Sequence, residues 1–228
     1  MKKAYNTAES ELPNKKLRNK KENLSDKTLK SSENPSFLSG NEKTINLSYM
    51  NLKSSDLKEL FNKVKNPYKV IELNLYDNRL TDISEIKLFK NLERLFLDYN
   101  EITDISGIKS LTELRELYLH NNKLTDISAL ENLTRLDILD IGYNKITDIS
   151  ALKDLTRLDI LNIGYNNIKD ISALKNLKKL KSLNLNNLQL KPDQIKYIKD
   201  LKLVQLFGNR AFKSDVLKQL NKNVTIYL

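Results

Sequence analysis

Apolar residues recur along the chain with a period of 22 residues between positions 73 and 190. Each period opens with two apolar residues separated by one other residue, as at Leu95 and Leu97. This alternation predicts a short strand that buries one of its faces. Because every period returns the chain to the same direction, the strands are expected to be parallel. The equivalent pairs are Leu73/Leu75, Leu117/Leu119, Leu139/Ile141, Leu161/Ile163 and Leu183/Leu185.

The tripeptide Asp-Ile-Ser follows five of these strands in steps of 22 residues, without slippage. Its aspartate is expected to cap the first amides of a helical turn with a side-chain oxygen. Few residues remain before the next strand, so the turn should be short and of the 3₁₀ type. The five aspartates are Asp82, Asp104, Asp126, Asp148 and Asp170.

An asparagine lies between each strand and its aspartate. A side-chain amide carries both hydrogen-bond donors and an acceptor, so stacked asparagines can bond the turn backbones of their own and neighbouring periods. Buried turns need such partners because their peptide groups would otherwise stay unpaired. The predicted structural asparagine ladder comprises Asn78, Asn100, Asn122, Asn144 and Asn166.

A single period cannot bury its own leucines, so the periods must stack and share a continuous core. Leucine fills 42 of the 228 positions, yet only 39% of the chain is hydrophobic. The leucines are therefore concentrated on a repeating lattice rather than spread along the chain.

The repeat, as in Asn122–Leu130, resembles that of leucine-rich repeat proteins, specifically the 22-residue class shared by bacterial internalins and SDS22-type phosphatase regulators. The resemblance implies an α/β repeat fold. This fold is a right-handed, curved solenoid with a parallel sheet on its concave side and short 3₁₀ or helical segments on its convex side. It also implies a non-enzymatic scaffold that binds a protein on the concave face, with no cofactor.

The ends of the chain depart from the repeat. Residues 1–43 carry ten basic and six acidic side chains and few apolar ones, which predicts a disordered basic segment. Residues 44–228 are expected to form the repeat domain. Within it, residues 44–72 form an atypical first repeat with a helix near Asp56–Val64, residues 73–190 form the regular repeats, and residues 191–228 form a C-terminal cap. In this cap we expect a strand at Val204–Leu206, a helix ending near Leu220 and a last strand at Val224–Leu228.

Outward residues of successive strands should form columns across the concave face. The predicted partner-binding residues lie in these columns and at the rim beside them. The first column contributes Glu72, Arg94, Glu116, Ile138 and Ile160; the second contributes Asn74, Phe96, Tyr118, Asp140 and Asn162; the third contributes Tyr76, Asp98 and His120; and the rim contributes Tyr99, Tyr143 and Tyr165.

The repeat does not require aromatic residues at outward positions. Neighbouring strands lie about 4.8 Å apart, so the outward rings should fall into one exposed patch. The patch comprises Tyr76, Phe96, Tyr118 and His120, and Tyr99 borders it. Exposed aromatic anchors of this kind dominate the energetics of protein interfaces. The alternative is that cross-strand aromatic pairs only stabilise the sheet. Gly142 and Gly164 have two interpretations. They leave room for a bulky side chain of the partner, or they merely reflect duplication of the repeat.

Composition excludes several kinds of chemistry. The chain has no cysteine and a single histidine, so disulfides, thiolate zinc sites and multi-histidine metal sites are ruled out. His120 is expected near Asp98 and Asp140, but no nucleophile occupies the adjacent columns, so we predict neither catalysis nor a bound metal. The net charge of +10 comes from 32 lysines against 7 arginines, beside 28 asparagines. This composition is typical of an AT-rich bacterial genome and does not favour nucleic-acid binding.

No run of about 18 apolar residues is present, so no membrane span is predicted. The sequence shows neither a signal peptide nor a C-terminal sorting motif. We therefore predict a monomeric, cytoplasmic protein-binding scaffold. Two alternatives stay open: an exported bacterial effector or internalin-like adhesin that binds a host protein, and a cytosolic subunit that resembles phosphatase regulators.

Overall fold

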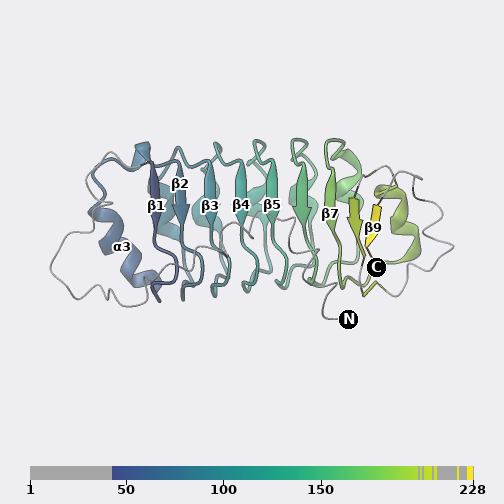
Figure 1. Cartoon of the computed structure of the whole chain (residues 1–228), viewed down its shortest axis with the longest axis horizontal. Helices are drawn as coiled ribbons and strands as arrows, with labels where there is room; N and C mark the ends of the chain where they lie inside the picture. Colours follow the sequence, from purple (N-terminus) through teal and green to yellow (C-terminus); the bar gives the residue numbers. More distant parts are fainter. Residues whose placement is uncertain are drawn as a thin grey trace. The chain divides into compact units, whose positions relative to one another are not determined.

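The computed structural model describes residues 43–199, 201, 203–206, 208–209, 220 and 225–227. Its nine described strands pair side by side in chain order and are all parallel (Figure 1). Leu73 pairs with Leu95, and Leu95 pairs with Leu117, so the register repeats every 22 residues. The strands are β1 (Thr44–Asn46), β2 (Glu72–Asn74), β3 (Arg94–Phe96), β4 (Glu116–Tyr118), β5 (Ile138–Asp140), β6 (Ile160–Asn162), β7 (Ser182–Asn184), β8 (Leu203–Gln205) and β9 (Thr225–Tyr227).

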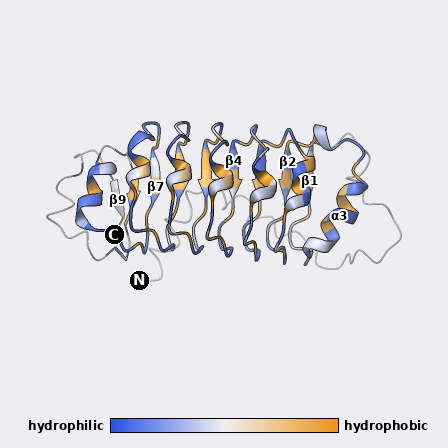
Figure 2. Cartoon of the chain, turned by 180° about the vertical axis from the view of Figure 1, so that it is seen from behind, coloured by the Kyte–Doolittle hydropathy of each residue, from blue (hydrophilic) through white to orange (hydrophobic). Residues whose placement is uncertain are grey.

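Short 3₁₀ helices form a layer on the other side of the core (Figure 2). In each regular turn the aspartate accepts a hydrogen bond from the backbone N–H of the serine two residues later, for example Asp104 from Ser106 at 2.7 Å. This capping confirms the prediction from Asp-Ile-Ser. The helices are η2 (Pro67–Lys69), η3 (Ser84–Leu88), η4 (Ser106–Ile108), η5 (Ser128–Leu130), η6 (Ser150–Leu152), η7 (Ser172–Asn176) and η8 (Pro192–Tyr197).

The core runs without interruption between the sheet and the 3₁₀ layer. Leu95 and Leu97 enter it from β3, and Leu111 and Leu114 enter it from the returning turn; all four side chains are fully buried. The predicted α/β leucine-rich fold with a parallel sheet and short 3₁₀ turns is thus confirmed.

The asparagine ladder is buried along the edge where the strands end. Asn122 donates from Nδ2 to the carbonyls of Leu97 and Leu119, at 3.0 and 3.1 Å. Its Oδ1 accepts the backbone N–H of Ile102 from the preceding repeat at 3.0 Å. Each amide therefore ties two consecutive repeats together, as predicted.

Both ends of the solenoid differ from the regular repeats. Helix α3 (Ser54–Asn62) follows β1, close to the helix predicted at Asp56–Val64. Lys53 is the N-cap residue, and the Asp56 carboxylate accepts the Lys53 backbone N–H at 2.8 Å.

At the other end the ladder breaks at the buried Leu188 and resumes at Asn209, whose Nδ2 donates to the Leu185 carbonyl at 2.7 Å. The predicted N-terminal disorder and the predicted helix that ends near Leu220 fall mainly on residues outside those that the structure describes.

Candidate functional site

The columns predicted from the sequence lie on the side of the sheet that faces away from the 3₁₀ helices, called here the open face. The strand register aligns the first-column residues Glu72, Arg94, Glu116, Ile138 and Ile160. It likewise aligns the second-column residues Asn74, Phe96, Tyr118, Asp140 and Asn162. The structure therefore brings the predicted site residues together on one surface.

The predicted exposure of Phe96 and Tyr118 is wrong. Their rings stack on each other, with centroids 4.9 Å apart and planes 5° apart. Phe96 is 6% exposed and Tyr118 is 1% exposed. Strands only about 4.8 Å apart crowd their outward side chains, so a large ring in mid-sheet is covered by its neighbours. These two stacked rings stabilise the sheet and present little surface to a partner.

The three other second-column residues are also buried, and each accepts a hydrogen bond from the backbone N–H two residues later. Asp140 accepts the N–H of Gly142 at 3.0 Å, and Asn162 accepts the N–H of Gly164 at 3.0 Å. Asn74 does the same for Tyr76. These side chains hold the chain where it leaves each strand, which gives them a structural role.

First-column residues are half-buried and carry charge at one end of the face only. Arg94 Nε donates to the Glu72 carboxylate at 2.6 Å, and the Tyr118 hydroxyl donates to Glu116 at 3.1 Å. Ile138 and Ile160 continue this column as an apolar strip.

His120 lies between the two aspartates predicted to be near it. Its backbone N–H donates to Asp98 Oδ1 at 2.8 Å, and its Nδ1 lies 3.4 Å from Asp140 Oδ1. Asp98 is fully buried, and Oδ2 of this carboxylate has no hydrogen-bond partner among the described residues. Loss of solvation, together with the nearby charge of Asp140, raises the pKa of the Asp98 carboxyl well above its usual range.

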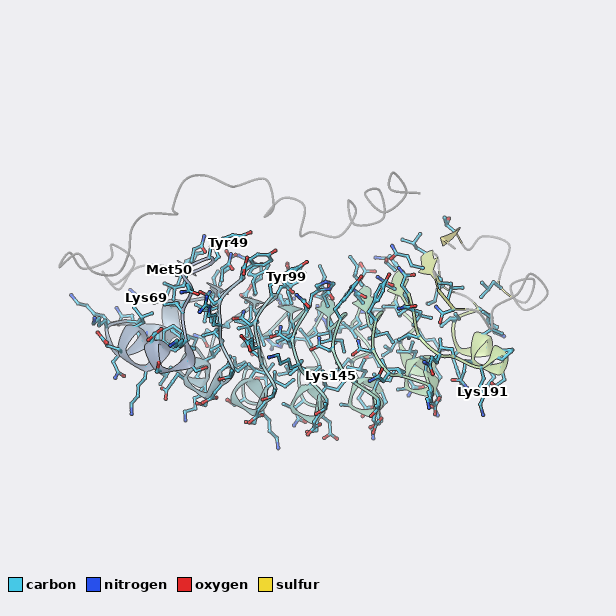
Figure 3. All side chains as sticks on the ribbon, turned by 90° about the horizontal axis from the view of Figure 1, so that it is seen from below. Tyr49, Met50, Lys69, Tyr99, Lys145 and Lys191 are labelled. Carbon is cyan, nitrogen blue, oxygen red and sulfur yellow. The ribbon has the colours of Figure 1, made fainter. Side chains whose placement is uncertain are left out.

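Six rings form a continuous row along the edge of the open face, which we call the aromatic ridge. Figure 3 shows two of its members, Tyr49 and Tyr99, on the side opposite the 3₁₀ helices. Consecutive ring centroids are 5.1, 5.3, 5.7, 4.8 and 4.0 Å apart. Tyr49 and Tyr143 are the most exposed members, at 54% and 42%. In order the ridge comprises Tyr49, Tyr76, Tyr99, His120, Tyr143 and Tyr165.

Four of the six ridge residues have a left-handed backbone conformation. The φ angles of Tyr49, Tyr99, Tyr143 and Tyr165 lie between 53° and 61°. Asparagine, aspartate and glycine tolerate this region, whereas a bulky side chain there is uncommon and strained. Asp77, Asn121 and Asn187 occupy the same turn position in other repeats. The tyrosines are therefore placed against the local backbone preference, which is typical of functional positions.

Each of the six repeats that form the ridge contributes one ring, which comes from one of two positions in the repeat. Where the turn residue is Asp77 or Asn121, the preceding third-column residue supplies the ring as Tyr76 or His120. Where the turn residue is tyrosine, the third column holds a smaller residue: Ser48, Asp98, Gly142 or Gly164. This compensation keeps the ridge continuous without doubling a ring.

An open groove with a volume of about 900 Å³ runs beside the C-terminal half of the ridge. Tyr143 and Tyr165 form part of its lining, and the ladder residues Asn144 and Asn166 also contribute. We call it the edge groove. Its other lining residues are Asn121, Asn122, Lys145, Asn167, Asn187, Leu188, Gln189, Leu190 and Gly208.

The family model for leucine-rich repeats in two copies matches residues 69–110 and 112–154. These ranges coincide with the stacked strand and 3₁₀ units described above. The chain is a leucine-rich repeat protein. Proteins of this family are generally non-enzymatic scaffolds that bind other proteins.

The solved structures similar to this leucine-rich repeat protein include three from bacteria. An internalin (inlF) of Listeria monocytogenes is 36% identical over 81% of this chain and 52% of its own, with a TM-score of 0.70. The present chain thus spans about half the length of that internalin.

A second Listeria structure, internalin C2 (inlC2), is 27% identical over 81% of this chain and 80% of its own, with a TM-score of 0.67. A leucine-rich repeat protein of Leptospira interrogans, 23% identical with a TM-score of 0.58, covers 82% of this chain and 60% of its own and shares the fold. A comparison with curated protein sequences found no match.

The described part of the chain holds no group of three or more His, Asp or Glu side chains that could bind a metal ion. No helix within it is both long enough and apolar enough to cross a membrane.

Sequence reasoning missed Tyr49 as a site residue, because the irregular first repeat hides its register. The signal that could have revealed it is the tyrosine that recurs at the turn position where other repeats have Asp77 or Asn121.

Proposed function

We propose that this leucine-rich repeat protein binds a partner protein through the open face of its sheet, with the aromatic ridge as the main contact. The ridge carries the proposal, because one ring per repeat is maintained even where tyrosine strains the backbone. Large aromatic side chains contribute most strongly to protein interfaces. The charged first column formed by Arg94, Glu72 and Glu116 would then contribute to specificity.

The position and exposure of the aromatic ridge favour a role in partner binding over a purely structural role. A stabilising cross-strand pair is already provided by the buried Phe96 and Tyr118. The ridge lies at the edge, where Tyr49 and Tyr143 stay exposed to solvent. A continuous row of rings that stays at least partly exposed is the kind of apolar surface that marks interaction sites in soluble proteins.

The test is affinity capture with a double variant, Tyr99→Asn and Tyr143→Asn, compared with the unchanged chain. Asparagine accepts the left-handed turn, so the variant should fold normally. We expect it to lose the captured partner, whereas a control on the 3₁₀ side, Lys109→Ala with Lys153→Ala, keeps it. Equal capture by all three proteins would overturn the proposal. Alanine at Phe96 or Tyr118 is unsuitable, because truncating a buried ring costs about 3–5 kcal/mol of stability.

Similarity to two Listeria internalins favours an exported, host-directed role over the predicted cytoplasmic location. Under this second proposal the partner is a host protein, and the chain acts as an effector or adhesin. Fractionation of the producing cells tests it: the chain should be found in the medium or at the cell surface. Recovery in the cytoplasm alone would contradict it. The phosphatase-regulator alternative stays a prediction from the repeat.

A further inference from the structure

The first column of the open face changes from charged to apolar between β4 and β5. Glu116 of β4 pairs in register with Ile138 of β5, and Ile138 pairs with Ile160 of β6. All three side chains are half-buried. In the described part of the chain, neither isoleucine belongs to the hydrophobic core or packs against it. The two isoleucines therefore form an apolar strip on the open face, directly beside a carboxylate.

The charged part of the column has an excess of negative charge. Arg94 Nε donates to the Glu72 carboxylate at 2.6 Å, which forms an ion pair within the column. This hydrogen bond, together with the charges of Glu72, Glu116 and Glu93, raises the pKa of the Arg94 guanidinium. Three carboxylates thus act on one cation, so this end of the face attracts positive charge.

Glu116 is the carboxylate that this arrangement leaves for a partner. Its Oε2 accepts the Tyr118 hydroxyl at 3.1 Å, and the described residues place no cation in contact with it. The adjacent Arg115 reaches instead toward Asp137, with its Nη1 3.5 Å from that carboxylate. The Tyr118 hydroxyl therefore holds the Glu116 carboxylate beside the apolar strip without neutralising its charge.

The spacing of Glu116, Ile138 and Ile160 fits an α-helix better than an extended segment. Two strand steps separate Glu116 from Ile160, a distance of about 10 Å. Residues i and i+7 of an α-helix lie on one face and about 10.5 Å apart along the axis. In an extended segment, the first and third residues of one face lie about 13.5 Å apart, which would pass Ile160.

We infer that the partner protein contributes an amphipathic helix that lies along the first column, across strands β4 to β6. A cationic side chain of this helix pairs with Glu116, and apolar side chains one and two turns further along pack on Ile138 and Ile160. Amphipathic helices commonly bind through anchors at i, i+3 or i+4, and i+7. The excess of carboxylates repels a helix with an acidic residue at the first anchor. The inference rests on the proposed function, because it names the element that the partner brings to the open face.

The probe for this inference is an alanine-based helical peptide of about 17 residues, with an arginine at i and leucines at i+4 and i+7. Binding to the full, isotope-labelled chain is followed by two-dimensional NMR. Glu116→Gln keeps an acceptor for the Tyr118 hydroxyl but removes the charge, so it should weaken binding about fivefold. Ile160→Ser introduces the residue that the same column has at Ser182, and it should weaken binding about threefold. The matched control, Glu131→Gln, changes an exposed carboxylate on the 3₁₀ side and should leave binding within about twofold.

A charge exchange tests whether the ion pair with Glu116 is direct. Glu116→Lys should bind the arginine peptide more weakly than the unchanged chain does. It should bind a second peptide, with glutamate in place of the arginine, more tightly than the unchanged chain does. Circular dichroism and urea unfolding establish that all variants are folded. The same preference for the arginine peptide in both proteins would contradict a direct pair.

The absence of chemical-shift changes with the arginine peptide at millimolar concentration, or equal binding by Glu116→Gln, would overturn the inference. Tighter binding of a version in which proline breaks the helix would assign the first column to an extended segment and would also overturn it. Loss of capture in the ridge double variant, without peptide binding, would keep the proposed function and reject the inference. Peptide binding with unchanged capture by the ridge double variant would keep the helix site and reject the ridge as the main contact.

Discussion

The side-chain amide of Asn162 fills the place that a Cβ of Gly142, just beyond the end of the neighbouring strand β5, would occupy. A Cβ at position 142 would be 2.8 Å from the Asn162 Nδ2, closer than real Cβ contacts. The same amide accepts the N–H of Gly164 through its oxygen at 3.0 Å, so it has little freedom to move away. Gly142 is therefore required by packing inside the solenoid, and the space beside it is already filled by Asn162.

Gly142→Ala should destabilise the protein by about 1–3 kcal/mol, the usual cost of overpacking a filled site. Urea unfolding measures the change. Gly164→Ala should behave alike, since a Cβ there would lie 2.8 Å from the Asn184 Oδ1. In an Asn162→Ala background the cost of Gly142→Ala should shrink by about 1 kcal/mol, because the clash partner is gone. If the effects of Gly142→Ala and Asn162→Ala are strictly additive in this double-mutant cycle, the contact with Asn162 is not the reason that position 142 needs glycine.

Asn122→Ala removes two donors and one acceptor that join consecutive repeats. The N–H of Ile102 would be left buried without a partner, whereas the carbonyls of Leu97 and Leu119 would each lose one hydrogen bond and keep the one from Asn100 or Asn144. The orphaned N–H costs about 1–3 kcal/mol and each of the two lost hydrogen bonds about 0.5–1.5 kcal/mol, so we expect a total loss of about 3 kcal/mol. The matched control is Asn167→Ala, an exposed asparagine of the same edge, which should change stability by less than about 0.5 kcal/mol. Comparable losses from both variants would refute a special role of the ladder.

The repeat made most of the fold predictable from the sequence. Alternation at Leu95 and Leu97 sets which side chains enter the core, and the five copies of Asp-Ile-Ser set the 3₁₀ turns. The buried ladder followed from the need to pair the backbone of stacked turns. These features depend on local pattern and on a fixed period, both of which are visible in one chain.

The site was less predictable, because burial on the open face depends on neighbouring repeats. Periodicity placed Phe96 and Tyr118 on the outward side correctly, but it could not show that they cover each other. The ridge joins side chains from two positions, the third column at Tyr76 and the turn at Tyr99. Their adjacency becomes visible only when the turn geometry is known.

At position 99, asparagine should give a more stable protein than alanine, by about 1 kcal/mol. The left-handed backbone costs alanine about 1–2 kcal/mol, whereas asparagine adopts it readily. Urea unfolding of Tyr99→Asn and Tyr99→Ala measures the difference. The same pair of substitutions at Lys123, which lies outside the left-handed positions, serves as the control. There alanine should be the equal or better residue, and an identical ranking at both positions would mean that the turn conformation has no energetic role.

Asp98→Asn should stabilise the protein at neutral and alkaline pH. Because the folded state raises the pKa of this carboxyl above its unfolded value near 4, the folded protein binds more protons in the window between the two values. Stability contributed by Asp98 is then full below the unfolded pKa and declines as pH rises toward the folded pKa. The variant lacks this decline but keeps an acceptor for the His120 N–H. Urea unfolding at pH 5 and pH 8 should show the variant gaining at least about 1 kcal/mol over the unchanged chain between these values.

His120 and Asp140 face the same carboxyl, and a histidine also titrates within this window. His120→Gln separates the two causes. If Asp98 is responsible, the decline between pH 5 and pH 8 persists in His120→Gln and disappears in Asp98→Asn. The reverse pattern would assign the pH dependence to the imidazole. Asp154→Asn, a change at an exposed carboxylate of the convex side, should follow the unchanged chain at both pH values.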